Sequence, residues 1–236
     1  MKKDNSRRSF IKSSALAAGA FFIVPRHVLG KGYTAPSDKL NLAAIGAGGK
    51  GTGDIFNAYN NGVNNVVALC DVDFGQAKIS AERFPKAKKY ADFRKMFEEM
   101  GKEIDAVTIS APDHVHGVAA MAAMQNGIHV YVQKPLTHNI YEARQLTEAA
   151  RKYKIVSQMG NQGASNPGQQ QMKDWYNKGL IGTVDTVYVW TNRPVWPQGI
   201  PVPSGNPALP ATMSKENWDL FVGPADYVDY HPLYHP

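Results

Sequence analysis

The chain has 236 residues, and its only cysteine is Cys70, which excludes an intramolecular disulfide. Its formal net charge is +6, but residues 1–31 hold seven of the 26 Lys and Arg residues and only one of the 20 acidic residues. The rest of the chain is therefore neutral and does not indicate a nucleic-acid-binding protein. About 205 residues follow this segment, enough for one large domain or one domain and part of another.

The N-terminus has the pattern of an export signal. Arg7 and Arg8 precede an apolar run of about 12 residues, too short for a transmembrane helix, which needs roughly 20. This pattern is typical of a twin-arginine signal, which sends folded proteins to the periplasm; the alternative is a disordered basic tail. We expect residues 1–31 to engage the twin-arginine export machinery, and to tether the protein to the membrane if they are not cleaved. No stable transmembrane span is expected.

Short apolar runs alternate with helical patterns between Leu40 and Gln158. Runs of this kind suit strands buried on both faces, and their alternation with helices predicts a parallel sheet with crossover helices. We therefore expect a doubly wound α/β fold of Rossmann type over residues 38–160. The expected strands are 40–46, 66–71, 88–92, 105–111, 128–133 and 154–158, and the expected helices are 52–60, 74–83, 93–100, 115–126 and 139–152.

The pattern changes after Gly160. An amphipathic stretch predicts a helix over 166–179, and an alternating, β-branched stretch predicts a strand over 183–191. From Pro194 onward the chain holds nine of its 15 prolines, so no regular structure is expected over 192–210. We expect residues 161–236 to begin a second unit that no further helix or strand completes.

The strongest chemical signal is IGAGGKG, which gives G-x-G-x-x-G at Gly46, Gly48 and Gly51. It follows an expected strand, opens an expected helix and precedes Asp71 by about 20 residues, which is the arrangement of a dinucleotide site. Gly46 permits a tight turn, Gly48 lets the backbone approach a pyrophosphate, and Gly51 lets the helix pack on the strand. With Gly49 and the helix N-terminus, these glycines are expected to bind the phosphates. The alternative is a glycine-rich turn without a ligand.

Asp71 ends the second expected strand. A carboxylate in this place accepts hydrogen bonds from the ribose 2′-OH of NAD and repels the 2′-phosphate of NADP. NAD is therefore expected as the cofactor and NADP is disfavoured, a preference that Lys50 would weaken if it folds over the site.

Two further loops are expected at the carboxyl ends of strands, where ligands bind in open α/β sheets. The first contains Pro112 and His116, which we expect to lie against the cofactor. Its H-x-H spacing is not a specific metal motif, and no metal is expected. The second places Lys134 beside the expected nicotinamide position, with Pro135 holding it out of helical geometry. An ammonium here is suited to stabilise a developing alkoxide; the alternative is a solvated lysine that ends a strand.

The segments IGAGGKG, ALCDVD, SAPDHVHG and GIHVYVQKPL together resemble the glucose–fructose oxidoreductase, inositol dehydrogenase and rhizopine-catabolism (Gfo/Idh/MocA) oxidoreductase family. The lysine–proline pair is the hallmark of the family, usually after Glu, and here Gln133 precedes it. Three segments resemble exported, sugar-handling bacterial members of the family: the signal segment 1–31, QMGNQG at 158–163 and RPVWPQG at 193–199. The resemblance implies a Rossmann domain, a C-terminal α/β domain with an open sheet, and Lys134 as a catalytic residue. It also implies an Asp and His motif beyond Pro236, so we expect this chain to be the N-terminal part of a longer protein.

The resemblance further implies hydride transfer between a tightly bound NAD and a sugar or cyclitol hydroxyl, and we expect a homo-oligomer. Two alternatives stay open: an NAD-assisted glycosidase or lyase that acts through a transient keto-sugar, and a non-catalytic sugar-binding protein. Amides pair with hydroxyls and indoles stack on sugar rings, so the candidate sugar contacts are Asn161, Gln162, Trp190, Arg193 and Trp196. Trp190 has an equally good interpretation as a core residue of its strand.

Overall fold

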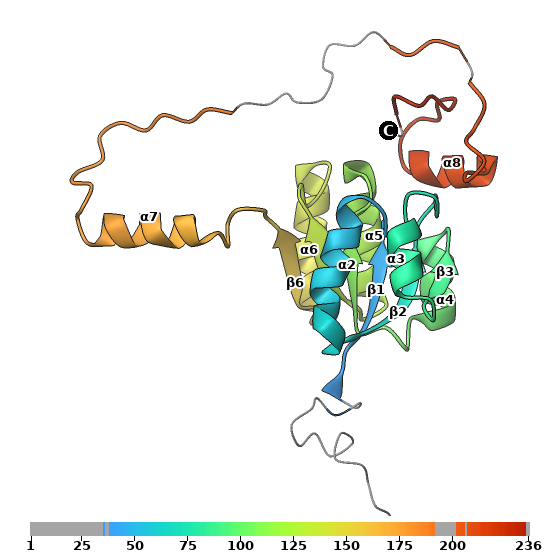
Figure 1. The fold of residues 1–236 in the computed structure, drawn as a ribbon, viewed down its shortest axis with the longest axis horizontal. Coiled ribbons are helices and arrows are strands. Elements are labelled where there is room, and N and C mark those ends of the chain that lie inside the picture. The colour runs from blue at the N-terminus through green and yellow to red at the C-terminus, as the bar shows by residue number, and fades with distance from the viewer. Residues whose placement is uncertain (1–34, 36–37, 192–201, 206, 235–236) are drawn as a thin grey trace, which may run out of the picture. The chain divides into compact units, whose positions relative to one another are not determined.

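A six-stranded sheet is the centre of the fold (Figure 1) in the computed structural model, which describes residues 35, 38–191, 202–205 and 207–234. Every neighbouring pair of strands is parallel, and the order is β3-β2-β1-β4-β5-β6. This order is that of a Rossmann sheet, so the predicted doubly wound α/β fold is confirmed. The strands are β1 (Asn41–Ile45), β2 (Asn65–Cys70), β3 (Lys88–Tyr90), β4 (Ala106–Ile109), β5 (His129–Gln133) and β6 (Ser157–Gly160).

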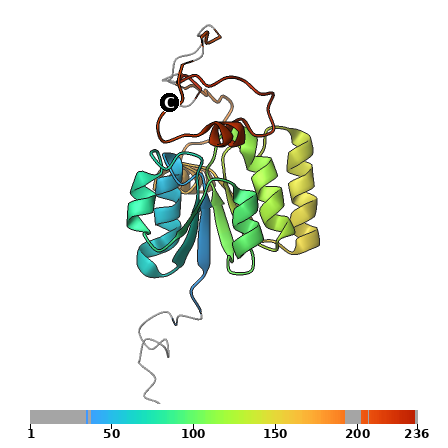
Figure 2. The same cartoon turned by 90° about the vertical axis from the view of Figure 1, so that its right-hand side faces the viewer.

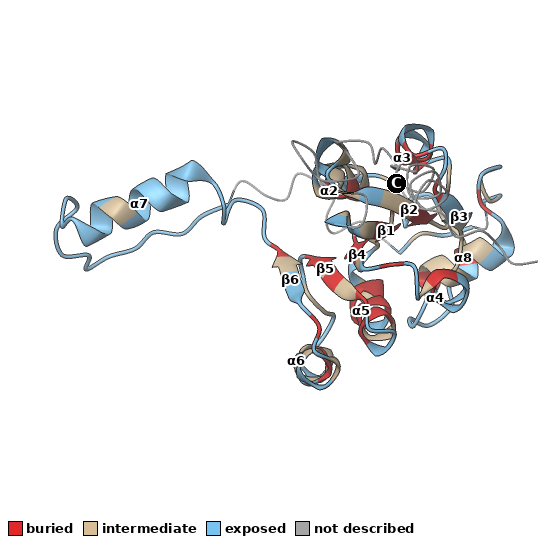
Figure 3. Cartoon of the chain, turned by 90° about the horizontal axis from the view of Figure 1, so that it is seen from below, coloured by how far each residue is buried: buried red, intermediate tan, exposed pale blue. Residues whose placement is uncertain are grey.

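Helices cover both faces of the sheet (Figures 2 and 3). This arrangement buries most residues of β1, β4 and β5, which explains the continuous apolar runs of these strands, whereas the edge strands β3 and β6 keep exposed residues. Two helices pack on one face and three on the other; the first two are α2 (Lys50–Tyr59) and α3 (Lys78–Arg83), and the other three are α4 (Phe93–Met100), α5 (His116–Gln125) and α6 (Ile140–Tyr153).

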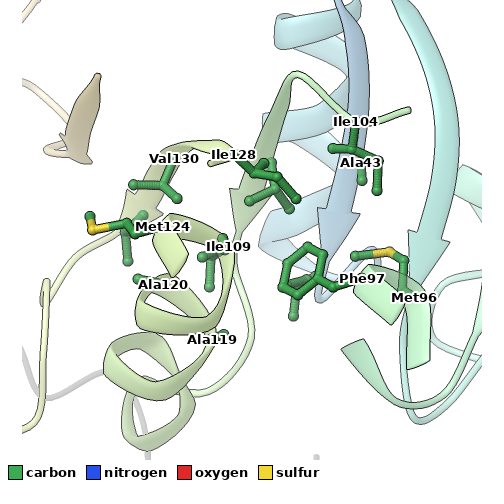
Figure 4. Packing of buried hydrophobic residues seen from close by; sticks show 14 of the residues in the cluster. Ala43, Met96, Phe97, Ile104, Ile109, Ala119, Ala120, Met124, Ile128 and Val130 are labelled. Carbon is green, nitrogen blue, oxygen red and sulfur yellow. The ribbon is translucent and has the colours of Figure 1, made fainter. Parts of the chain in front are cut away.

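The core consists of two apolar clusters separated by the sheet. Successive side chains of a strand point to opposite faces, so Ala44 of β1 joins the cluster of Ile55 from α2. Ala43, its neighbour, joins the cluster of Phe97 from α4, which extends across α5 (Figure 4). Both alanines are fully buried, and their small side chains let the helices approach the central strand closely.

The last strand begins later than predicted. Helix α6 ends at Tyr153, and Lys154 takes a left-handed conformation with φ of 56°. The chain then turns back, because the N–H of Ile155 donates to the carbonyl of Ala150 at 2.9 Å. Residues 154–156 are therefore used to end the helix, and β6 forms only from Ser157.

The second unit is partly as predicted. Helix α7 (Pro167–Asn177) forms where a helix was expected, with Pro167 in its first turn and the Asn166 side chain accepting from the N–H of Gly168. The strand predicted over 183–191 is wrong: these residues belong to no strand of the described chain. Their composition favours a strand, but a strand requires a partner for its backbone groups, and Val189 is 90% exposed.

A helix not expected from the sequence, α8 (Lys215–Val222), follows the proline-rich stretch. Its signals are present in the sequence: Ser214 accepts from the N–H of Asn217 at 3.1 Å, Glu216 lies in the first turn, and Gly223 ends the helix. Two short 3₁₀ helices, η2 (Asn60–Gly62) and η3 (Asp113–Val115), complete the elements described. Within the described ranges, no helix has the length and apolarity needed to cross a bilayer.

Candidate functional site

The turn after β1 can be made only by glycines at two positions. Gly46 has φ of +75°, and a Cβ there would lie 2.4 Å from the backbone N of Ala111. A Cβ at Gly51 would lie 1.8 Å from the carbonyl O of Gly46. Both distances are impossible contacts, so Gly46 brings β1 against the loop after β4 and Gly51 brings α2 against the turn. These are the turn and packing functions predicted for the two residues.

The middle of the turn faces outward. Gly49 has φ of +49°, a Cβ there would meet nothing within 4 Å, and the residue precedes α2 without a side-chain cap. The first N–H groups of α2 are thus not covered by a capping side chain, which suits a phosphate. A Cβ at Gly48 would lie 2.9 Å from the carbonyl O of Gln76. Gly48 is therefore required by packing within the protein, in addition to the phosphate approach that the sequence predicts.

Asp71 fixes the glycine turn to the end of β2. Its Oδ2 accepts from the N–H groups of Ala47 at 2.8 Å and Gly48 at 3.0 Å, and its Oδ1 accepts from the N–H of Asp73 at 2.9 Å. Burial raises the pKa of Asp71 above its ordinary value; the three N–H donors oppose this rise and the nearby Asp73 carboxylate adds to it. The residue predicted to bind the ribose is thus partly buried and placed beside the glycine turn.

A cavity of about 350 Å³ lies along the turn. Its walls come from the ends of β1, β2 and β4, from residues 91–93 after β3, and from the C-terminal segment of the described chain. Pro112, predicted to contact the cofactor, lies in this lining together with Gly46, Gly48, Gly49 and Asp71. Leu220, Phe221 and Tyr234 also line it and were not foreseen, because they follow the glycine motif by more than 150 positions.

His116 does not line this cavity. Its ring is 1% exposed, with Nδ1 at 2.6 Å from the carbonyl O of Pro135 and Nε2 at 2.8 Å from the carbonyl O of Ala111. Both ring nitrogens are thus engaged by backbone atoms. This geometry favours a role in joining the loops after β4 and β5 over the direct cofactor contact that the sequence predicts.

Lys134 directly follows β5, as expected, and its side chain is exposed. The Gln133 Oε1 accepts from the Lys134 N–H at 3.2 Å, and the peptide bond from Lys134 to Pro135 is cis. Within the described ranges no acidic side chain forms an ion pair with its ammonium. The ammonium is therefore available to a ligand at the carboxyl end of the sheet, although its catalytic role stays a prediction.

A buried polar network connects the glycine turn to Lys134. Asp54 of α2 is 7% exposed, and its Oδ2 accepts from the Ser110 Oγ and the Gln133 Nε2, both at 2.8 Å. Its Oδ1 pairs with the Lys50 ammonium. The Gln133 Oε1, in turn, accepts from the Gln162 Nε2 at 2.7 Å. Lys50 is thus held along α2 by Asp54, so the condition under which it would weaken the preference for NAD, folding over the site, is not met in this structure.

The candidate sugar contacts fall into three groups. Asn161 and Gln162 follow β6, and Gln162 is joined to the network through Gln133. Trp190 is 85% exposed, so its interpretation as a core residue is wrong for the described chain, and no described contact brings it to the cavity. Arg193 and Trp196 lie outside the described residues. Among the residues described, no group of three or more His, Cys, Asp or Glu side chains is arranged to hold a metal ion.

A parallel sheet in this order, with a glycine turn into a helix and an acid at the end of β2, defines a nucleotide-binding protein of Rossmann type. The model of an oxidoreductase family with an NAD-binding Rossmann fold, Gfo/Idh/MocA, matches residues 40–161, about half of the chain. The chain belongs to this family.

Curated relatives share this region. The chain is 29% identical over 119 residues to inositol 2-dehydrogenase of Salmonella paratyphi B, which covers 50% of this chain and 35% of that protein. It is 28% identical over 167 residues to D-glucoside 3-dehydrogenase of Escherichia coli, covering 70% and 46%. The crystal structure of myo-inositol 2-dehydrogenase from Lactobacillus plantarum matches with a TM-score of 0.56 and 24% identity over 62% of this chain and 43% of that chain, which supports the fold. The chain spans less than half the length of these three proteins.

Proposed function

We propose that the protein is an NAD-dependent oxidoreductase that transfers hydride between the cofactor and a hydroxyl of a sugar or cyclitol. The observation that carries this proposal is the exposed ammonium of Lys134 at the same sheet edge as the glycine turn and Asp71. The names of two relatives, inositol 2-dehydrogenase and D-glucoside 3-dehydrogenase, support a polyhydroxylated substrate.

The residues present fit the cofactor. Gly46, Gly48 and Gly51 shape a turn that larger residues would block, and the uncapped N-terminus of α2 offers N–H donors for a pyrophosphate. Asp71 lies beside these donors and can accept from a ribose hydroxyl through oxygen lone pairs that its three N–H partners leave free. When bound, NAD supplies the hydride acceptor; the chain holds it and positions the hydroxyl.

Lys134 is proposed to contact the reacting hydroxyl. Its ammonium stabilises negative charge that develops on oxygen as the proton and hydride leave, so it acts more on the transition state than on binding. The neutral Gln133 beside it keeps this ammonium free of a fixed partner. A glutamate in that place, usual in the family, would supply a neighbouring anion.

The experiment is single-turnover reduction of bound NAD by a sugar or cyclitol in the full-length enzyme. Lys134→Ala should lower the rate of hydride transfer about 10²- to 10³-fold, the effect of removing one such donor, with NAD retention nearly unchanged. Lys134→Arg should restore little, because its planar fork suits a single-hydroxyl contact poorly. Lys102→Ala, which removes an exposed lysine elsewhere, is the control. Reduction at the unaltered rate in Lys134→Ala would show that Lys134 is only a solvated residue.

For the cofactor, we propose NAD over NADP. Asp71 repels a 2′-phosphate, and the Lys50 ammonium that would offset this repulsion is paired with Asp54. NADH should therefore bind more tightly than NADPH in a fluorescence titration, and Asp71→Ala should narrow the difference. Equal affinities for the two cofactors in the unaltered protein would contradict this assignment.

We also propose export by the twin-arginine route, on the sequence of residues 1–31. A protein that uses NAD outside the cytoplasm must acquire the cofactor before it leaves, and this route carries folded proteins. Replacing Arg7 and Arg8 by lysine should keep a fused periplasmic reporter in the cytoplasm. Unchanged export of the lysine variant would contradict the proposal.

A further inference from the structure

Helix α8 lies across one end of the Rossmann sheet (Figure 2), and two hydrogen bonds attach it to the loops after β2 and β4. The Asn217 Nδ2 donates to the carbonyl O of Val72, after β2, at 2.8 Å. The His114 Nε2–H donates to the carbonyl O of Phe221 at 2.7 Å, and His114 lies in η3 after β4. Since β1 lies between β2 and β4, α8 spans the crevice that the glycine turn opens.

A small apolar cluster around Trp218 holds α8 in place. Trp218 is 1% exposed, stacks on Phe221 with ring centroids 5.0 Å apart, and packs edge-on against Tyr230 at 5.1 Å. Its Nε1–H donates to the carbonyl O of Val228 at 2.8 Å. Val72, in the loop after β2, packs against the same cluster. The position of Phe221 is thus fixed from two sides, by Trp218 and by His114.

The cavity that α8 lines is the place expected for the adenosine half of a bound dinucleotide. Asp71, which would bind the adenosine ribose, lines the cavity with Phe221 and Tyr234, whereas Lys134 does not. Residues 91–93 line the same cavity. Adenine presents two flat apolar faces, and aromatic side chains bind such faces by stacking.

We propose that α8 and Tyr234 form the adenosine-side wall of the cofactor site and slow the release of the bound dinucleotide. The inference rests on the proposed function for the presence of NAD. The inference adds to the cofactor site a segment outside residues 40–161, the region that the family model matches. It assigns Phe221 as a cofactor contact and Asn217 as the residue that anchors α8 to the loop after β2.

The first test measures the dissociation rate of NADH by stopped-flow fluorescence, with excess NAD⁺ as the chase. Phe221→Ala, which removes the ring, and Asn217→Ala, which removes the bond to Val72, should each raise this rate about tenfold. The control is Tyr227→Ala, because Tyr227 follows α8 but does not line the cavity. An unchanged dissociation rate in Phe221→Ala would overturn the proposal.

A second measurement keeps the test decisive if Phe221→Ala does not fold. Amide hydrogen exchange of residues 215–222 in the unaltered protein should slow with NADH and with AMP, but not with nicotinamide mononucleotide. Binding of NADH without any change in these amides would overturn this inference and leave the proposed function standing. Absence of NADH binding would overturn the proposed function and this inference with it.

Discussion

At the scale of single residues, the presence of a neutral amide at Gln133 is explained by the negative charge of Asp54, which contacts it. Its Nε2 donates to the Asp54 Oδ2 at 2.8 Å, and both side chains are buried. A carboxamide offers a donor on one side and an acceptor on the other, and the acceptor receives Gln162. A glutamate would face the Asp54 carboxylate with a second negative charge, which is unfavourable away from water. The departure from the family's usual glutamate therefore fits the Asp54 network of this chain.

Gln133→Glu should destabilise the protein by about 1–3 kcal/mol, the range expected when a buried polar group loses its partner. Adding Asp54→Asn should recover part of the loss, because an asparagine can donate to the new carboxylate. Urea unfolding of the two single variants and the double variant measures the coupling. Strictly additive losses in the double variant would show that the two side chains do not interact in this way.

Asp71 gives a pH dependence. Ribose hydroxyls donate to the ionised carboxylate, so protonation weakens NADH binding. Because burial raises the pKa of Asp71, the affinity should begin to fall at a higher pH than for an ordinary aspartate. The free energy of unfolding depends on pH in the opposite direction to NADH affinity. Because the folded state holds the Asp71 proton more tightly than the unfolded state, the contribution of Asp71 to stability is lost as the pH rises from the ordinary pKa through the raised one.

The measurement for Asp71 is a series of NADH titrations from neutral pH downward. Asp71→Asn, which cannot ionise, should bind more weakly at neutral pH and lose this acid step. A step of the same midpoint in Asp71→Asn would assign the titration to another group.

At the scale of elements, α2 carries two glycines with opposite requirements. Gly51 has no room for a Cβ, whereas Gly53 has nothing within 4 Å. Alanine favours a helix over glycine by about 1 kcal/mol. Gly53→Ala should therefore stabilise the protein by about 0.5–1 kcal/mol, and Gly51→Ala should destabilise it by about 1–3 kcal/mol or more through overpacking.

Thermal unfolding and NADH titration of the two glycine variants provide the comparison. Gly53→Ala should bind NADH as the unaltered protein does, and Gly51→Ala should bind it more weakly. Equal stability of both variants would mean that α2 does not pack against the turn as described.

The elements that could be predicted are those whose signals are local. The strands of the sheet, the glycine turn and the position of Lys134 follow from apolar runs and motif spacing. The strand over 183–191 could not be excluded, because its sequence favours the extended form and only the missing partner prevents pairing. The Asp54 network and the cover by α8 depend on contacts between residues 79 and 145 positions apart, which no local pattern encodes.

At the scale of the whole molecule, the apolar stretch 187–190 should promote self-association. Val187 is 72% exposed and Val189 is 90% exposed. An extended segment with exposed apolar side chains and backbone groups outside any sheet pairs readily with other chains. The double substitution of both valines by serine should lower the sedimentation coefficient at high protein concentration. Val202→Ser, at a single exposed valine, is the control; an equal effect there would contradict the assignment.

The distance along the chain between the sheet and α8 sets an order of events during synthesis. The last strand ends at Gly160 and α8 begins at Lys215. At about 5–20 residues per second, a ribosome completes the sheet several seconds before it makes α8. During that interval the glycine turn and Asp71 form a site open to the cytosol on its adenosine side. If α8 forms the adenosine-side wall as we propose, a nucleotide that enters during this interval is held by the helix that emerges afterwards, and loading during synthesis is a consequence of the proposal.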